Sequence, residues 1–100
     1  MLLAQIAAFV ETARRRSVSR AADALFISQP ALTARLKGLE ADLGAELFIR
    51  TPRGMRLTDS GEAFLPYAVR ALETLTDGRM QVNAIERGGA GRLAIGAAPA

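Results

Sequence analysis

Hydrophobic residues in the first half of the chain recur at helical spacing in three successive stretches. The first stretch runs from Leu2 to Ala13 and predicts a helix of about four turns. A short, alanine-rich stretch over residues 20–25 predicts a second helix, and residues 29–43 predict a third. The third helix carries a regular stripe of leucines at Leu32, Leu36, Leu39 and Leu43. The pattern therefore predicts a mainly α unit of three helices.

The residues between these stretches suit helix ends and turns. Ser28 is an N-cap candidate for the third helix, because its hydroxyl can accept a hydrogen bond from a free backbone N–H. Pro30 is tolerated in the first turn, where the N–H groups have no helical partner. Gly44 suits the left-handed conformation in which many helices end. The second and third helices are thus predicted to be joined by a turn at residues 26–28.

Two short apolar runs follow the third helix and predict a β-hairpin. Residues 47–50 and 55–58 have the composition of strands, and the intervening Thr51–Gly54 segment contains Pro and Gly, which are typical of turns. The hairpin carries three arginines, at Arg50, Arg53 and Arg56. A short arginine-bearing hairpin after three helices is a candidate wing.

Residues 59–87 read as one long helix, which has acidic residues in its first turn. Pro66 falls inside this helix, so a kink or a later helix start is left open. Apolar and small residues follow heptad spacing, which predicts a dimerisation helix; they are Phe64, Ala68, Ala71, Leu75, Gly78, Val82 and Ile85. Gly78 weakens this seam locally.

These elements divide the chain into three parts. Residues 1–58 form a winged helix-turn-helix unit, and residues 59–87 form a linker and dimerisation helix. In residues 88–100, a glycine-rich hinge precedes a segment that looks like the first strand of a further domain that the chain does not include.

Composition and chain ends exclude several classes of protein. The chain has no Cys and no His, which excludes a disulfide framework, Cys or His zinc sites, and Cys–His or Ser–His catalysis. The sequence shows no paired carboxylates in an apolar setting, no phosphate-binding glycine loop and no metal-ligand cluster, so we expect neither an enzyme nor a metal site. No basic residue precedes the first apolar stretch, and no apolar run approaches the roughly 18–20 residues that span a bilayer. We therefore expect a cytoplasmic protein without a membrane partner.

Positive charge is concentrated in the first part of the chain. Residues 1–58 carry nine Arg or Lys and five Asp or Glu, a net charge of +4, whereas residues 59–100 carry four Arg and five acids, a net charge of −1. A polyanion would therefore dock on the first part. On charge alone, such a surface and an ordinary solvated surface are equally supported.

The face of the third helix opposite the leucine stripe has the chemistry to read DNA bases. Gln29 can bond the edge of adenine, and Thr33 can bond a base or touch a thymine methyl group. Pro30 and Ala34 lie on the same exposed face, and the small Ala34 allows close approach. The alternative is a solvated face of an ordinary helical bundle. The arginine-bearing hairpin that follows shifts the balance toward DNA.

The remaining candidate DNA contacts are cations and short polar residues. Arg53 at the hairpin tip is the candidate for minor-groove insertion. Arg35 lies near the leucine stripe and either reaches a phosphate or only covers the core. Arg50 and Arg56 either contact phosphates or are ordinary strand surface. The full set assigned to the DNA backbone is Ser19, Arg20, Ser28, Arg35, Lys37, Arg50 and Arg56.

Ordered motifs in residues 2–67 closely resemble the N-terminal domain of LysR-type transcriptional regulators. The resemblance rests on the segments 9–11, 17–22, 27–33, 39–44, 47–50, 53–54 and 57–61, which read FVE, SVSRAA, ISQPALT, LEADLG, LFIR, RG and LTDSG. A looser match to the linker helix extends to about residue 87, and residues 91–96 resemble the opening of the effector domain of the family.

The resemblance implies a winged helix-turn-helix that binds double-stranded DNA as a homodimer, often within a tetramer. It assigns base contacts to Gln29, Pro30 and Thr33 and a minor-groove contact to Arg53. Ala34 departs from the family, which often has Arg there. Phe26 stands at a turn position that is usually polar, and we expect it to be partly buried. The resemblance also implies a small-molecule inducer bound by a separate C-terminal domain, and no cofactor in this chain.

Two functional hypotheses remain open from the sequence. The leading one is a sequence-specific DNA-binding transcriptional regulator that reads a palindromic operator as a dimer, with helix 29–43 in the major groove. The second is a winged-helix module for protein–protein interaction, with the heptad helix as its main surface. The basic excess in residues 1–58 counts against the second hypothesis.

Overall fold

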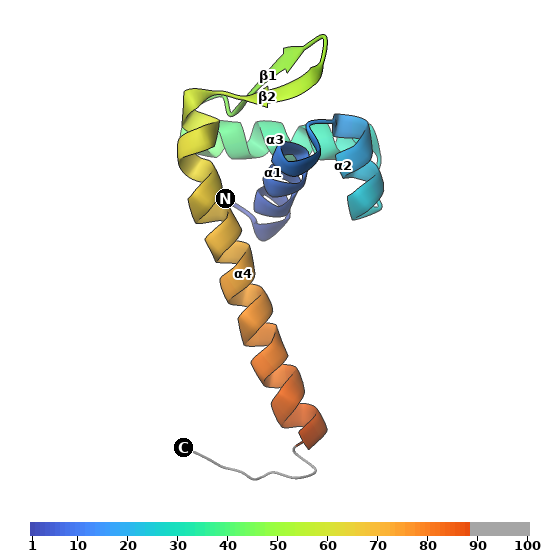
Figure 1. The fold of residues 1–100 in the computed structure, drawn as a ribbon, viewed down its shortest axis with the longest axis vertical. Helices are drawn as coiled ribbons and strands as arrows, with labels where there is room; N and C mark the ends of the chain where they lie inside the picture. The colour runs from blue at the N-terminus through green and yellow to red at the C-terminus, as the bar shows by residue number, and fades with distance from the viewer. Residues whose placement is uncertain (89–100) are drawn as a thin grey trace.

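Three helices, a β-hairpin and a long fourth helix follow one another in the computed structural model, which describes residues 1–88. The element order confirms the predicted winged helix-turn-helix with a long helix after it (Figure 1). The elements are α1 (Leu3–Arg15), α2 (Val18–Leu25), α3 (Gln29–Leu43), β1 (Phe48–Thr51), β2 (Gly54–Leu57) and α4 (Asp59–Gly88).

Side-chain caps explain where the helices of the helix-turn-helix begin and end. The Ser17 hydroxyl accepts the backbone N–H of Arg20 at 3.1 Å, so α2 begins at Val18, two residues earlier than predicted. The Ser28 hydroxyl accepts the N–H of Ala31 at 3.2 Å and starts α3 where the sequence predicted. Gly44 ends α3 in the predicted left-handed conformation, with φ 69°.

The core is centred on Phe9 of α1. Its side chain is fully buried, and its ring centroid lies 5.4 Å from that of Phe48 and 5.5 Å from that of Phe64. Phe9 therefore ties α1 to both the hairpin and α4. Leucines of α3 and of the loop after it, Leu32, Leu39 and Leu47, complete the most buried layer. Burial of each such side chain contributes about 1.5–3 kcal/mol to folding.

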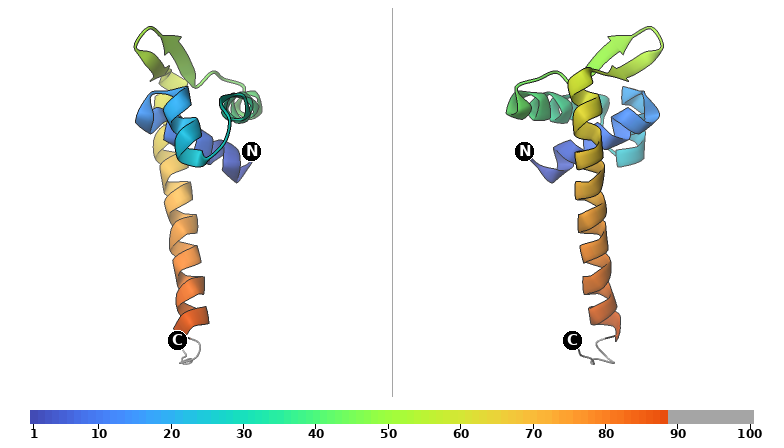
Figure 2. Two further views of the ribbon diagram at one scale, coloured as in Figure 1. Left: turned by 90° about the vertical axis from the view of Figure 1, so that its right-hand side faces the viewer. Right: turned by 60° about the vertical axis from the view of Figure 1, so that its left-hand side comes forward.

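The hairpin strands are shifted by about one residue from the predicted ranges. β1 and β2 pair antiparallel, with Phe48 opposite Leu57 and Thr51 opposite Gly54. Leu47 stays outside the strand because its N–H donates to a Glu40 carboxylate oxygen at 2.7 Å. The hairpin packs against α1 and the start of α4, at the end of the molecule opposite the end of α4 (Figure 2).

The first part of α4 packs against its own domain, which corrects part of the predicted dimerisation seam. Ala68 is 1% exposed, and the Phe64 ring contacts Phe9. Ala68 is thus not available to a partner, and Phe64 is partly covered by its own domain. A heptad pattern only marks apolar positions on a helix, and it does not say which neighbour covers them. The later seam positions Leu75, Val82 and Ile85 are more than half exposed.

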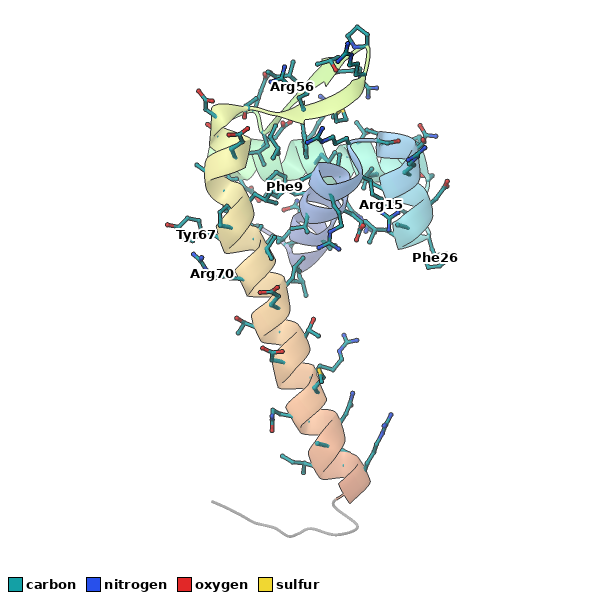
Figure 3. The ribbon with its side chains drawn as sticks, in the orientation of Figure 1. Phe9, Arg15, Phe26, Arg56, Tyr67 and Arg70 are labelled. Carbon is teal, nitrogen blue, oxygen red and sulfur yellow. The ribbon has the colours of Figure 1, made fainter. Side chains whose placement is uncertain are left out.

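Phe26 is 94% exposed, so the prediction of partial burial is wrong. It ends α2 in the left-handed conformation, with φ 58°, and its N–H bonds back to the carbonyl of Asp23 at 3.2 Å. This geometry turns the Phe26 side chain outward, while the next residue, Ile27, packs against the core. Figure 3 shows Phe26 at the end of α2 far from the hairpin.

The long helix α4 continues through Pro66 without a break. Its 30 residues extend about 45 Å and run away from the three-helix unit (Figure 1). Gly88 is the last residue of α4, and the strand predicted within residues 88–100 lies outside the described residues. None of the helices within residues 1–88 has the length and hydropathy required to cross a membrane.

Candidate nucleic-acid interface

The N-terminal part of α3 presents a short polar face to solvent. Leu32, Leu36 and Leu39 hold the opposite face in the core, which fixes the rotation of the helix. The exposed face carries Gln29, Pro30, Ala34 and Lys37, and Thr33 at its edge is half-buried. All four predicted base-reading residues thus lie along one side of α3.

Arg35 differs from the other predicted backbone contacts of α3. Its side chain is half-buried rather than fully exposed, in agreement with a position near the leucine stripe. Lys37 lies about half a turn further along the helix and is exposed. Lys37 can therefore place its charge in solvent with less rearrangement than Arg35.

The beginning of α2 forms a second exposed polar edge. Ser17 and Ser19 lie with their hydroxyl oxygens 3.1 Å apart, and the side chains of Ser19 and Arg20 are exposed. Ser17 already accepts the N–H of Arg20. The neighbouring hydroxyls and the guanidinium are groups that bind phosphate oxygens.

The hairpin holds its three arginines outside the core. Arg50 and Arg56 are exposed on β1 and β2, and Arg53 is exposed in the turn between them. Arg50 stands opposite Met55, and Arg56 opposite Ile49, so the two strand arginines are not paired directly with each other. Arg56 lies on the hairpin side of the molecule in Figure 3.

A cleft of about 480 Å³ joins these surfaces between the hairpin, the end of α1 and the start of α2. Its lining contains Gln29 and five arginines, which are Arg15, Arg16, Arg20, Arg50 and Arg53. Among the described residues, no Asp or Glu lines it. Arg15 pairs with Glu11 at 2.7 Å, and it is the one arginine of this lining that forms an ion pair within residues 1–88. The cleft is therefore strongly cationic.

Arg15 and Arg16 were not among the predicted DNA contacts. In the sequence, the run Arg14, Arg15 and Arg16 at the end of the first helix is explained by helix C-terminal charge, and phosphate binding is the less favoured alternative. The structure places Arg15 and Arg16 beside the wing because α1 ends with Arg16 in the left-handed conformation, with φ 55°, and α2 starts two residues later. The signal in the sequence was the position of this run directly before the cap of α2.

The fold and this surface define a winged helix-turn-helix protein with a cationic face. Residues 3–62 match the family model described as "Bacterial regulatory helix-turn-helix protein, lysR family". The chain belongs to this family. It is 46% identical to the transcriptional regulator BudR of Klebsiella aerogenes over 89 residues, which cover 88% of this chain and 62% of BudR.

Solved structures show the same architecture. CbnR, a LysR family transcriptional regulator, matches with a TM-score of 0.80 at 39% identity, over 88% of this chain and 30% of CbnR. The DNA-binding domain of BenM, in a complex with catB site 1 DNA, matches with a TM-score of 0.80 at 31% identity, over 86% of this chain and 97% of that chain. The chain spans 31% to 66% of the length of three curated relatives.

Proposed function

We propose that this chain is the DNA-binding part of a transcriptional regulator and reads a palindromic operator as a dimer. One observation carries the proposal: the polar face of α3 begins at the cationic cleft, and Gln29 belongs to both. A duplex that enters the cleft with its phosphates would bring base edges to the start of α3. This is how a recognition helix docks in the major groove.

Within this proposal, each part of the surface has its own task. Gln29, Pro30, Thr33 and Ala34 face bases, and Gln29 supplies the bidentate contact that distinguishes adenine. Arg53 enters the minor groove, where a narrow A·T-rich groove concentrates negative potential. Phosphates are held by the remaining polar set, Ser19, Arg20, Ser28, Arg35, Lys37, Arg50 and Arg56. Arg16 joins this set because it lines the same cleft.

The free part of α4 supports the dimer. Beyond the region that packs on α1, Leu75, Val82 and Ile85 keep heptad spacing and are exposed. Exposed large apolar side chains in a regular stripe are stabilised when a second helix covers them. A two-fold dimer presents two equivalent α3 helices, which match two half-sites separated by one helical turn of DNA, roughly 34 Å, or by a multiple of it.

The neighbours favour DNA over a protein partner as the ligand of this surface. The matching BenM domain was solved with DNA bound. The relatives carry the names of transcriptional regulators, and we propose accordingly that this chain catalyses no reaction. A small-molecule inducer bound by a further domain, a tetramer of the full-length protein and a cytoplasmic location also remain proposals.

Selection of bound sequences from a random duplex library tests the function directly. The bound pool is sequenced, and the affinity for the enriched duplex is measured at two or more salt concentrations. We expect an enriched inverted repeat and a steep fall of affinity with salt, because phosphate contacts release counterions. A scrambled duplex of equal length and composition is the control for non-specific binding.

The other outcomes separate the alternatives. Salt-dependent binding without an enriched motif would mean that the chain contacts the backbone alone, which contradicts base reading by α3. The absence of binding to any duplex at low salt would contradict the DNA-binding function and favour the protein-interaction hypothesis.

A further inference from the structure

The turn at the wing tip has its positive-φ residue, Gly54, directly after the two-residue connection rather than within it. Thr51 and Gly54 are paired, so Pro52 and Arg53 form the two-residue connection. Proline fixes φ near about −65°, whereas the turns that match strand twist need a positive φ at this first position. Gly54 with φ 112° lets the chain enter the second strand, and side-chain contacts hold the rest of the tip.

The hydroxyl of Thr51 supplies two of these contacts. It donates a hydrogen bond to the carbonyl oxygen of Gly54 at 2.8 Å and accepts one from the backbone N–H of Arg53 at 3.2 Å. One side chain thus bonds to the backbone within the turn, at Arg53, and directly after it, at Gly54. The Thr51 side chain is half-buried, while Arg53 is exposed.

We infer that Thr51 is a positioning residue for Arg53. The hydrogen bond to the Arg53 N–H fixes the peptide from which the guanidinium projects, so the arginine is directed before DNA arrives. An ordered wing loses less conformational freedom on binding than a mobile one. This inference rests on the proposed function, because it assigns a role to Thr51 only in the contact of Arg53 with the minor groove.

Two matched substitutions separate the hydroxyl from the shape of the side chain. Thr51→Val keeps the β-branched shape and removes the hydroxyl, and Thr51→Ser keeps the hydroxyl. Affinity is measured for the duplex enriched in the selection, with A·T-rich and with G·C-rich flanks. We expect Thr51→Val to weaken binding to the A·T-flanked duplex by roughly 2- to 10-fold per half-site, because only the hydrogen bond to the Arg53 N–H acts on the DNA contact. Binding to the G·C-flanked duplex should change less. Thr51→Ser should keep the wild-type ratio of the affinities for the two duplexes.

A double-mutant cycle with Arg53→Ala decides whether the two residues act together. Arg53→Ala keeps the backbone N–H, so the Thr51 hydrogen bonds can still form. We expect Thr51→Val to have no further effect on affinity in the Arg53→Ala background. An equal loss in both backgrounds, or no loss in the wild-type background, would overturn the inference.

Two controls keep these results interpretable. Urea denaturation of each variant shows whether the fold is retained. If Thr51→Val is unstable, the Thr51→Ser protein still tests the inference. Loss of the preference for A·T-rich flanks in a folded Thr51→Ser protein would overturn it. If the wild-type chain itself shows no salt-dependent binding to any duplex, the proposed function fails, and the role of Thr51 fails with it. That result differs from one in which the wild-type chain binds and the cycle shows no coupling.

Discussion

The carbonyl oxygen of Arg16 accepts the backbone N–H of Met55 at 3.1 Å. Arg16 ends α1 in the left-handed conformation, and Met55 belongs to β2 of the wing. This bond joins the wing to the end of α1, one residue before the cap of α2. The position of the wing relative to the helix-turn-helix is therefore set at this junction.

Gly54→Ala should destabilise the fold through the same junction. Gly54 has φ 112°, and a Cβ at this position would overlap the carbonyl oxygen of Arg16. We expect a loss of at least about 2 kcal/mol in the free energy of unfolding, measured by urea denaturation. Gly44→Ala is the control, because Gly44 also has a positive φ but open space around it, and it should cost about 1 kcal/mol. Equal losses for both variants would contradict a steric role of Arg16.

Phe26→Gly should stabilise the protein. Phe26 holds a left-handed conformation that is unfavourable for a residue with a Cβ, and its exposed ring buries little surface. Glycine relieves this strain, but it also has greater entropy in the unfolded chain. The net result should be an increase of about 0.5–1 kcal/mol in the free energy of unfolding. Phe26→Ala keeps the Cβ and should change the free energy of unfolding by less than about 0.5 kcal/mol. A loss of about 3 kcal/mol for Phe26→Ala would show that the ring is buried after all.

Gln29→Ala and Lys37→Ala should weaken DNA binding in different ways. Gln29 faces bases in the proposal, so its loss should relax preference at one position of each half-site by about 1–3 kcal/mol. Lys37→Ala should weaken binding to all sequences alike and reduce the salt slope by about 1 per half-site. Repeated selection with each variant measures the first effect, and salt titration measures the second. Unchanged preference in Gln29→Ala would contradict the assigned reading face.

Val82→Lys should dissociate the dimer without unfolding the domain. Val82 is 58% exposed in the single chain and lies on the proposed seam. A lysine pair buried there should weaken association by about 3 kcal/mol or more. Met80→Lys is the matched control, because Met80 is 62% exposed and lies on roughly the opposite side of α4. Sedimentation measures the masses, and equal dimer content in both variants would exclude this seam.

Local sequence signals were sufficient for most of the elements. The serine cap and glycine stop of α3, at Ser28 and Gly44, were identified correctly because each acts on backbone groups within a few residues. The leucine stripe also predicted which face of α3 is buried. The exposed candidate base-reading face follows from that stripe alone.

Contacts between distant segments were not predictable in the same way. The Phe64 and Ala68 positions fitted a dimer seam, but Phe64 contacts Phe9 of its own domain and Ala68 is buried in the same core. Phe26, at a turn position that is usually polar in the family, was expected to be partly buried, yet it has a left-handed backbone and is 94% exposed. In both cases the sequence shows an apolar residue, but which neighbours surround it depends on the packing of other elements.

The sequence by itself determined the order of the elements, the rotation of α3 and the family of the protein, because these follow from periodicity, caps and motif order. Only the tertiary structure decided that Arg15 and Arg16 stand beside Arg53, and that the wing is joined to α1 through Arg16. Those relationships depend on the angles at which helix ends meet the hairpin. Such angles arise from the simultaneous packing of α1, β1 and α4 around Phe9, which no local pattern encodes.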